Sequence, residues 1–318
     1  MENSHVWTVR DVLNWTSQKF AGLELPTPLL DAQLLIGSVL SLSKVQIYTQ
    51  LDRPLIPLER AQLRELVRRR LLGEPVAYLL NQKSWHNLDL FVDKRVLVPR
   101  PETETLLDVV LAISRSSSQK PNRILDLCTG SGCLAIALAK SFPEAQVDAV
   151  DVSAEALEIA KLNATRNEVS NVVFHQGDAT SADFLTSLRS DSEFEFVVSN
   201  PPYVSEAEWL ECDPSVRDFE PKLALVGGQR GWDMPAQLLN ALTAAGILSH
   251  AKIVGLELGV THPSVLAETL LPELTPEWCA QPWTEFSCQR PAWEFPTQQW
   301  FAVRDYAQQS RFLFLRRA

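Results

Sequence analysis

The spacing of apolar residues predicts helices in the first quarter of the chain. In residues 29–42, apolar side chains recur at the period of an amphipathic helix. A second helix is expected to begin near Pro57 and to end at Gly73, because proline is favoured in the first turn of a helix and glycine just past the last. We therefore predict a small helical domain over residues 1–80.

The pattern changes after this domain. Residues 88–98 are strand-like on both sides of Asp93 and Lys94, which predicts a β-hairpin centred on these two residues. The hairpin would form most of a linker over residues 81–99. The next segment, residues 99–114, carries the start signals and the apolar spacing of a helix.

From residue 123 onward, short apolar runs alternate with helical patterns. The runs predict strands at residues 123–128, 146–153, 171–178, 194–200, 252–259 and 311–317. Such alternation is typical of a mainly parallel sheet that is covered by helices on both faces. We therefore expect an α/β, doubly wound domain over residues 100–318.

Charge and cysteine usage restrict the possible functions. The 318 residues carry a formal net charge of -10, and the acidic excess lies after residue 99. An acidic body repels phosphate backbones, which disfavours tight binding to bare DNA, whereas it tolerates a cationic ligand. The five cysteines and five histidines are scattered without metal-ligand spacing, which favours a reducing cytoplasm and predicts no metal site. No apolar run is long enough to predict a membrane span.

A glycine-containing turn follows the first strand of this domain. Gly130, Ser131 and Gly132 stand where a strand meets a helix, so the backbone can approach a ligand closely. Asp151 ends the next strand 21 residues after Gly130, where a carboxylate can accept hydrogen bonds from both ribose hydroxyls of a nucleoside. The turn also satisfies the dinucleotide pattern G-x-G-x-x-A, so NAD is an alternative ligand.

Charge distinguishes the two cofactors. NAD carries a pyrophosphate, which favours a helix N-terminus without nearby anions. S-adenosylmethionine carries an ammonium and a sulfonium group and no phosphate. Asp126 stands just before the turn, where it can face the methionine amine, and Asp178 ends the third strand near the expected adenine edge. Carboxylates at three strand ends therefore favour S-adenosylmethionine.

The fourth strand ends in Asn200, Pro201, Pro202 and Tyr203. The two prolines stiffen the backbone, and Pro201 keeps Asn200 out of helical geometry. The side-chain oxygen of Asn200 and the carbonyl near Pro201 can then accept both hydrogens of one planar –NH2 group, against which the Tyr203 ring can lie. We expect these four residues to be catalytic and to hold either a carboxamide or an aromatic amine. No side-chain base is needed, because the nitrogen becomes acidic as a methyl group arrives.

Five motifs then occur in a characteristic order. They are GEPVAYL (73–79), LVPRPETE (97–104), DLCTGSGCLAIALA (126–139), SNPPY (199–203) and FEPKLALVGGQRG (219–231). Together they resemble the peptide chain release factor N5-glutamine methyltransferases, the PrmC/HemK family. The resemblance implies a seven-stranded, Rossmann-like class I methyltransferase domain that follows the helical domain in the sequence. It also implies methylation of the glutamine in the Gly-Gly-Gln motif of release factors, with S-adenosylmethionine as the methyl donor.

The resemblance also assigns roles by position. Asn200 would contact both cofactor and substrate, residues 201–203 would contact the substrate glutamine, and the slightly basic helical domain would bind the release factor. We expect a monomer with no direct nucleic-acid partner and no membrane association. The residues expected at the cofactor are Cys128, Thr129, Gly130, Ser131, Gly132, Asp151, Asp178, Ala179 and Asn200.

Some features depart from the family pattern. Ala179 stands where the family often has an aromatic residue, and Cys128 where it often has glycine. Residues 276–300 exceed the family norm, and we expect them to form a packed surface loop. The chain also contains its own Gly-Gly-Gln at 227–229, where the family already has Gly-Gly. Two rival functions are an adenine-N6 nucleic-acid methyltransferase, which shares the Asn-Pro-Pro motif, and a non-catalytic module that binds release factors.

Overall fold

The computed structural model describes residues 6–23, 25–117, 120–190, 192–270, 281–290, 296 and 299–317. The chain forms two compact units. The first contains Met1–Gln82 and Asp213–Phe219, and the second contains Lys83–Cys212 and Glu220–Ala318. In the described part of the chain, no helix is both long enough and apolar enough to cross a membrane.

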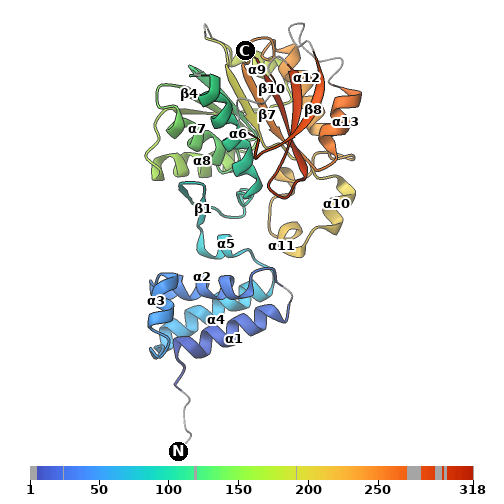
Figure 1. The fold of residues 1–318 in the computed structure, drawn as a ribbon. Helices are drawn as coiled ribbons and strands as arrows, with labels where there is room; N and C mark the ends of the chain where they lie inside the picture. The colour runs from blue at the N-terminus through green and yellow to red at the C-terminus, as the bar shows by residue number, and fades with distance from the viewer. Residues whose placement is uncertain are drawn as a thin grey trace, which may run out of the picture. The chain divides into compact units, whose positions relative to one another are not determined.

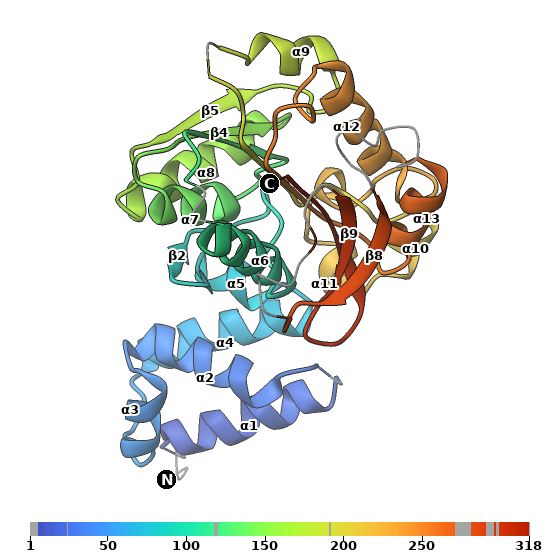
Figure 2. The same cartoon turned by 45° about the horizontal axis from the view of Figure 1, so that its top comes forward.

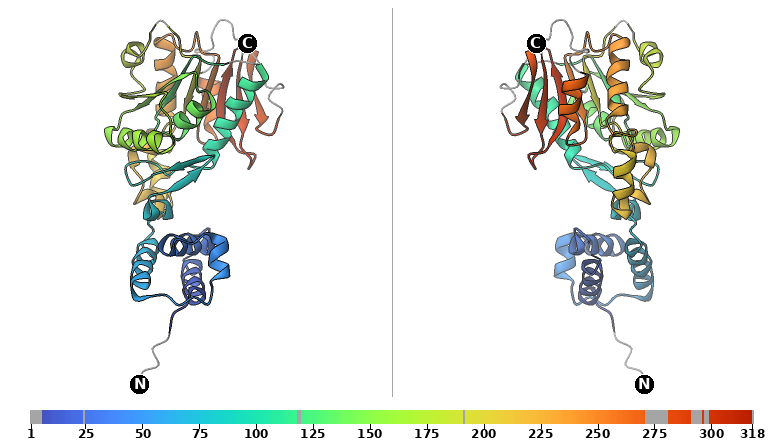
Figure 3. Two further views of the ribbon diagram at one scale, coloured as in Figure 1. Left: turned by 90° about the vertical axis from the view of Figure 1, so that its left-hand side faces the viewer. Right: turned by 90° about the vertical axis from the view of Figure 1, so that its right-hand side faces the viewer.

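The first unit is built from short helices, of which those in residues 9–71 are blue in Figure 3. They are α1 (Val9–Ala21), α2 (Pro28–Leu40), α3 (Lys44–Thr49), α4 (Pro57–Leu71) and α5 (Val76–Leu80), with α11 (Pro214–Arg217) from the later segment. α2 packs against α1, α3, α4 and α5. The core between them contains Phe20, Leu35, Ile47 and Leu63. The helices predicted at 29–42 and from Pro57 are confirmed as α2 and α4.

A buried ion pair joins α2 to α4. Arg70 Nε lies 2.8 Å from Asp31 Oδ2, and the two side chains are only 9% and 7% exposed. The hydroxyl of Thr27 donates to the other carboxylate oxygen of Asp31 at 2.8 Å. Apolar periodicity does not predict this pair, because both charged residues lie on the buried faces of their helices.

The second unit contains a large sheet and a separate two-stranded ribbon, β1-β2. The strands are β1 (Lys83–Trp85), β2 (Leu88–Leu90), β3 (Arg123–Leu127), β4 (Gln146–Asp151), β5 (Val172–Gln176), β6 (Phe196–Ser199), β7 (Ile253–Glu257), β8 (Gln281–Ser287), β9 (Gln299–Arg304) and β10 (Ser310–Arg316). The sheet runs in the order β5-β4-β3-β6-β7-β10-β9-β8. Strands β3 to β7 are parallel, and β10 is antiparallel to both of its neighbours. The expected seven strands are present, and β8 adds an eighth at the edge beside β9.

Helices cover both faces of this sheet, as Figures 1 and 2 show. They are α6 (Glu102–Ser117), α7 (Cys133–Ser141), α8 (Ala154–Arg166), α9 (Ala182–Ser187), α10 (Glu206–Glu211), α12 (Asp233–Ala244) and α13 (His262–Thr269), with the 3-10 turn η1 (Lys222–Ala224). On one face α7 lies between α6 and α8 and contacts β3 and β4. On the other, Leu185 of α9, Leu238 of α12 and Leu266 of α13 share one core with strand residues. The predicted layered α/β architecture is confirmed.

The hairpin lies within residues 81–99, as predicted, but its turn is not at Asp93 and Lys94. β1 and β2 pair antiparallel up to Trp85 and Leu88, so the turn lies between these two residues, and residues 91–98 contain no strand. The Asn163 side chain accepts a hydrogen bond from the Phe91 N–H at 2.7 Å and donates to the Phe91 carbonyl at 3.0 Å. A side chain of α8 thus satisfies backbone groups that a strand partner would otherwise satisfy.

The surface loop expected at residues 276–300 is wrong where the structure describes it. β8 and the start of β9 lie in this segment, and both belong to the large sheet. Trp300 is 2% exposed and packs in the core beneath the sheet. Trp278 and Trp293 lie outside the described residues.

Replacement of Arg70 tests the buried ion pair. Arg70→Ala leaves the Asp31 carboxylate buried without its partner, so we expect the free energy of unfolding to fall by about 3 kcal/mol. Urea denaturation of the full chain, followed by circular dichroism, measures the change. The control is Arg68→Ala on the same helix, which removes an exposed pair with Glu65 and should leave the midpoint unchanged. Equal losses in the two variants would contradict a special role for the buried pair.

Candidate active site

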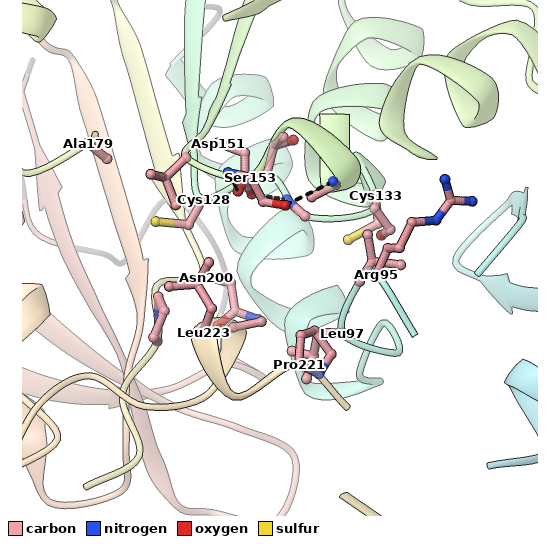
Figure 4. Close-up of a pocket in the computed structure, with 18 of the residues that line it drawn as sticks. Arg95, Leu97, Cys128, Cys133, Asp151, Ser153, Ala179, Asn200, Pro221 and Leu223 are labelled. Carbon is pink, nitrogen blue, oxygen red and sulfur yellow. Dashed lines mark hydrogen bonds between the residues drawn. The ribbon is translucent and has the colours of Figure 1, made fainter. Parts of the chain in front are cut away.

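A cavity of about 610 Å³ lies at the carboxyl ends of the parallel strands β3, β4 and β6 (Figure 4). Parallel strands end at the same edge of a sheet, so the segments that follow them meet there. Of the predicted site residues, the lining contains Cys128, Thr129, Gly130, Ser131, Asp151, Asp178, Ala179, Asn200 and Pro202. Gly132, Pro201 and Tyr203 are their chain neighbours but are not part of this lining.

The turn after β3 has a backbone that side chains disfavour. Cys128 has φ +60° and Gly130 has φ +54°, both in the left-handed region. A Cβ atom on Gly130 would have only the Cys128 carbonyl oxygen nearby, at 4.0 Å. Gly130 therefore leaves room for a ligand to reach the backbone of the turn, and Cys128 adopts a conformation that glycine reaches more easily.

Asp151, at the end of β4, holds this turn in place. Its Oδ2 accepts a hydrogen bond from the Gly130 N–H at 2.8 Å, and its Oδ1 accepts one from the Ser153 N–H at 2.9 Å (Figure 4). Burial raises the pKa of Asp151, and these backbone donors act in the opposite direction. Each carboxylate oxygen can accept a second hydrogen bond, so the group remains available to a ligand hydroxyl.

Asp126, on β3, is the most deeply buried carboxyl of the cavity wall. It is 1% exposed, and its Oδ2 accepts hydrogen bonds from the Thr129 hydroxyl at 2.6 Å and from the Ala135 N–H at 3.1 Å. Its Oδ1 has no hydrogen-bond partner among the residues that the structure describes. Burial raises the pKa of Asp126 to about 7. An unpartnered buried carboxylate oxygen at a cavity favours a ligand that brings a cationic donor.

Asp178 occupies a more open position beyond β5. It is exposed, and its Oδ1 accepts hydrogen bonds from the Thr180 N–H at 2.8 Å and from the Thr180 hydroxyl at 2.7 Å. Ala179 beside it is 5% exposed and packs in the core of the sheet. The wall of the cavity is therefore acidic at three strand ends. No group of three or more His, Cys, Asp or Glu among the described residues could hold a metal ion.

The Asn-Pro-Pro-Tyr segment forms a corner directly after β6. Asn200 Nδ2 donates to the Thr103 hydroxyl oxygen at 3.1 Å, which leaves Asn200 Oδ1 free to accept a hydrogen bond from a ligand in the cavity. The Tyr203 hydroxyl donates to Glu257 Oε1 at 3.1 Å. Burial raises the pKa of Tyr203, so its ring stays neutral. The corner is anchored on both sides of Pro202.

The glycines at 227 and 228 support this corner. The Gly227 N–H donates to the Val204 carbonyl at 2.9 Å, and the Val204 N–H donates to the Leu225 carbonyl at 2.8 Å. A Cβ atom on Gly227 would lie 2.3 Å from the Pro202 carbonyl oxygen. Only glycine allows this approach, so the chain's own Gly-Gly-Gln has a packing reason that does not involve its exposed Gln229.

Sequence reasoning identified the LVPRPETE and FEPKLALVGGQRG segments by resemblance but gave them no physical role. Both segments line the cavity, at Leu97, Arg100 and Thr103 and at Leu223 among others. The buried Glu220 joins them, because it accepts hydrogen bonds from the Arg100 guanidinium at 2.7 Å and from the Val98 N–H at 3.0 Å. Glu257 stands inside an otherwise apolar run of the sequence, and this position was a signal for a functional residue that was missed. The sequence around Thr103 gave no such signal.

Comparisons with known proteins decide the family. Residues 11–80 match the family model of the PrmC N-terminal domain, and residues 104–211 match that of the methyltransferase small domain. The release factor glutamine methyltransferase of Chlorobaculum tepidum is 44% identical over 230 residues, which are 71% of this chain and 78% of that protein. The chain belongs to the release factor glutamine methyltransferase family. The family that the motifs predicted is confirmed.

Two further similarities extend this result. The release factor glutamine methyltransferase of Nitratidesulfovibrio vulgaris is 33% identical over 311 residues, which are 98% of this chain and 95% of that protein. Among solved structures, the hMettl16 catalytic domain in complex with MAT2A 3'UTR hairpin 6 matches with a TM-score of 0.52 at 14% identity, over 79% of this chain and 82% of that chain. At this identity the likeness shows the fold alone, and the predicted class I methyltransferase fold is confirmed.

Two glycine substitutions test whether the corner and the turn after β3 act separately. In Gly227→Ala the new Cβ meets backbone atoms, so we expect the free energy of unfolding to fall by about 1–3 kcal/mol and methyl transfer to fall more than cofactor affinity. In Gly130→Ala the new Cβ enters open space but the backbone at φ +54° strains an alanine, so we expect a smaller loss of stability than in Gly227→Ala and the largest fall in cofactor affinity. Denaturation, calorimetric binding of S-adenosylmethionine and a transfer assay measure the three quantities. The same pattern of losses in both variants would show that the two segments do not act separately.

Proposed function

We propose that this release factor glutamine methyltransferase methylates the side-chain amide nitrogen of the glutamine in the Gly-Gly-Gln motif of peptide chain release factors, with S-adenosylmethionine as methyl donor. The corner after β6 carries this proposal. It places a free amide oxygen of Asn200 at a cavity whose wall is acidic. Acceptors for an –NH2 group and anions for a cationic donor are thus combined at one site.

The residues present fit S-adenosylmethionine. Asp126 Oδ1, which has no partner among the described residues, suits the ammonium group of the methionine part. The open space at Gly130 lets the methionine part reach the backbone of the turn. Asp151 can accept hydrogen bonds from the ribose, and Asp178 and Ala179 lie where we expect the adenine. The bound cofactor would supply a methyl group on a positively charged sulfur. NAD would instead bring a pyrophosphate to an acidic wall, which Coulomb repulsion opposes.

The chain itself would position and activate the acceptor nitrogen. An amide nitrogen is a poor nucleophile, because its lone pair is delocalised into the carbonyl group. Asn200 Oδ1 and the Pro201 carbonyl would accept both of its hydrogens, which fixes the amide and raises the electron density on nitrogen. The Tyr203 ring would lie against the amide plane. The nitrogen becomes acidic when it is methylated, so its proton can leave without a side-chain base.

The predicted domains would divide the work of recognition and chemistry. Residues 1–80 would recognise the release factor, residues 81–99 would link the parts, and residues 100–318 would carry the methyl transfer. We propose a cytoplasmic monomer without a direct nucleic-acid partner. An adenine-N6 methyltransferase is the second candidate, because the same two acceptors can hold the amino group of adenine.

A transfer assay tests the acceptor. We expect label from S-adenosylmethionine to appear on a release factor and not on DNA or RNA. The label should be lost when the acceptor glutamine is replaced by alanine. It should also fall at least about 100-fold in Asn200→Ala, because the acceptor nitrogen is then no longer held. Labelled nucleic acid, or no label on any acceptor, would refute the proposal.

The charge of Asp126 gives a test of cofactor binding. Because its pKa is raised to about 7, the carboxyl is protonated in about half of the molecules at pH 7 and must ionise to bind an ammonium group. We therefore expect affinity for S-adenosylmethionine to be about tenfold weaker at pH 6 than at pH 8. Calorimetry in buffers of different ionisation enthalpy should also detect proton release near pH 7.

Two variants serve as controls for this measurement. Asp126→Asn should bind weakly at both pH values and release no proton. Asp178→Asn removes an exposed carboxylate and should keep the wild-type pH dependence. If the pH dependence survives in Asp126→Asn, another group is responsible.

A further inference from the structure

One carboxyl group of the second unit has no part in the mechanism proposed above. Glu257 ends β7 and is fully buried, and in the described part of the chain its Oε2 atom has no hydrogen-bond partner. Ser199 of β6 pairs with Leu256 of β7, so Glu257 lies level with Asn200. Burial of an ionisable group is costly, and a carboxyl beside a catalytic corner therefore needs an explanation.

Two hydroxyl groups face this carboxyl. The Tyr203 hydroxyl donates to Glu257 Oε1 at 3.1 Å, and hydrogen bonding by the Thr103 hydroxyl also lowers the pKa of Glu257. Thr103, at the start of α6, is 1% exposed and belongs to the cavity lining. Its oxygen accepts a hydrogen bond from Asn200 Nδ2 at 3.1 Å. Glu257 thus binds Tyr203 directly, and it lies close to Thr103, which holds Asn200.

The direction of these hydrogen bonds follows from the chemistry of the groups. An ionised carboxylate only accepts hydrogen bonds, so a hydrogen bond between Thr103 and ionised Glu257 uses the single hydrogen of the Thr103 hydroxyl. The Thr103 oxygen can then only accept, and Asn200 must present its –NH2 group to it. The amide oxygen of Asn200 is thereby left for the substrate. This conclusion does not depend on which end of the amide is drawn as nitrogen.

We infer that Glu257, in its ionised form, is a positioning residue for the acceptor amide. Through Thr103 it keeps the oxygen of Asn200 available to the substrate, and through Tyr203 it fixes the ring of the corner. This inference rests on the proposed function, because only an acceptor with an –NH2 group requires that orientation of Asn200.

Protonation of Glu257 would remove the constraint. A protonated carboxyl can donate to the Thr103 oxygen, and the Thr103 hydroxyl is then free to donate to Asn200. Asn200 would then turn its –NH2 group toward the –NH2 group of the substrate. Two hydrogen-bond donors repel each other, so the substrate would no longer be held. The charged and titratable groups that face Glu257 are Glu102 of α6, Arg311 of β10 and Tyr203.

Burial raises the pKa of Glu257 to about 7, and Glu102 adds to this, while Arg311 and the two hydroxyls oppose it. The ionised, active form is therefore lost as the pH falls through about 7. The rate of methyl transfer should fall with it.

The test is the pH dependence of kcat for methylation of a release factor, measured at saturating S-adenosylmethionine from pH 5.5 to 8.5. Wild type should show an acidic limb near pH 7. Glu257→Gln has nearly the same shape but cannot ionise. We expect kcat to fall about 10- to 100-fold and the limb to disappear, while calorimetric affinity for S-adenosylmethionine stays within about twofold of wild type.

A threonine series tests the connection itself. Thr103→Val removes the hydroxyl and keeps the shape, so it should reproduce the loss in Glu257→Gln. Thr103→Ser keeps the hydroxyl and should recover most of the rate. The matched control is Thr105→Val, two positions along α6. Thr105 is also buried, but it takes no part in the hydrogen bonds of Asn200 with Thr103 and of Tyr203 with Glu257. It should keep both the wild-type rate and the acidic limb. Circular dichroism and thermal melting establish that each variant is folded.

The outcomes separate this inference from the proposed function. If wild type labels a release factor but Glu257→Gln keeps the wild-type rate and limb, the positioning role is wrong and the function stands. The same holds if Thr103→Val and Thr103→Ser are equally active. If wild type labels no release factor, the proposed function fails first. If the Glu257→Gln and Thr103→Val variants lose rate while Thr103→Ser retains it, the inference is supported.

Discussion

The parallel pairing of β3 with both β4 and β6 is the constraint on which the site depends. Their carboxyl ends meet at one edge of the sheet, so the glycine turn, Asp151 and the corner at Asn200 surround one cavity. These segments are far apart in the chain, and each has an ordinary structural explanation by itself. Their meeting at one cavity supports a function that needs a cofactor and an acceptor together.

Asp126 and Glu257 are two buried carboxyls at this site: Asp126 lines the cavity, and Glu257 contacts Tyr203 of the corner. Asp126 and Glu257 each have a pKa near 7 and one oxygen without a hydrogen-bond partner. Such groups cost stability, because burial disfavours their charge. The first faces the expected cofactor, and the second acts on the acceptor side through Thr103 and Tyr203. Buried groups that cost stability and lie together at one site are typical of a functional site.

Much of the fold and part of the site could be predicted from residues alone. Apolar periodicity predicted α2, α4 and the strands β3 to β7, because these elements bury their apolar residues at regular intervals. Local chemistry predicted that Asp151 and Asn200 belong to one site, and both line the cavity, while their roles toward cofactor and acceptor stay predictions. Periodicity failed at residues 91–98, where alternating apolar residues pack without a strand partner and Asn163 satisfies the backbone.

The sequence by itself determined the helices α2 and α4, the strands β3 to β7, the family, and the residues that follow these strands, because these depend on local propensity and on motifs. Only the tertiary structure decided which distant groups meet. Glu220 with Arg100, Arg70 with Asp31, and Glu257 with Tyr203 are pairs between segments that lie 39 to 120 positions apart. A hydrogen bond depends on the distance and direction between two atoms, and for such residues only the packing of the whole chain fixes both.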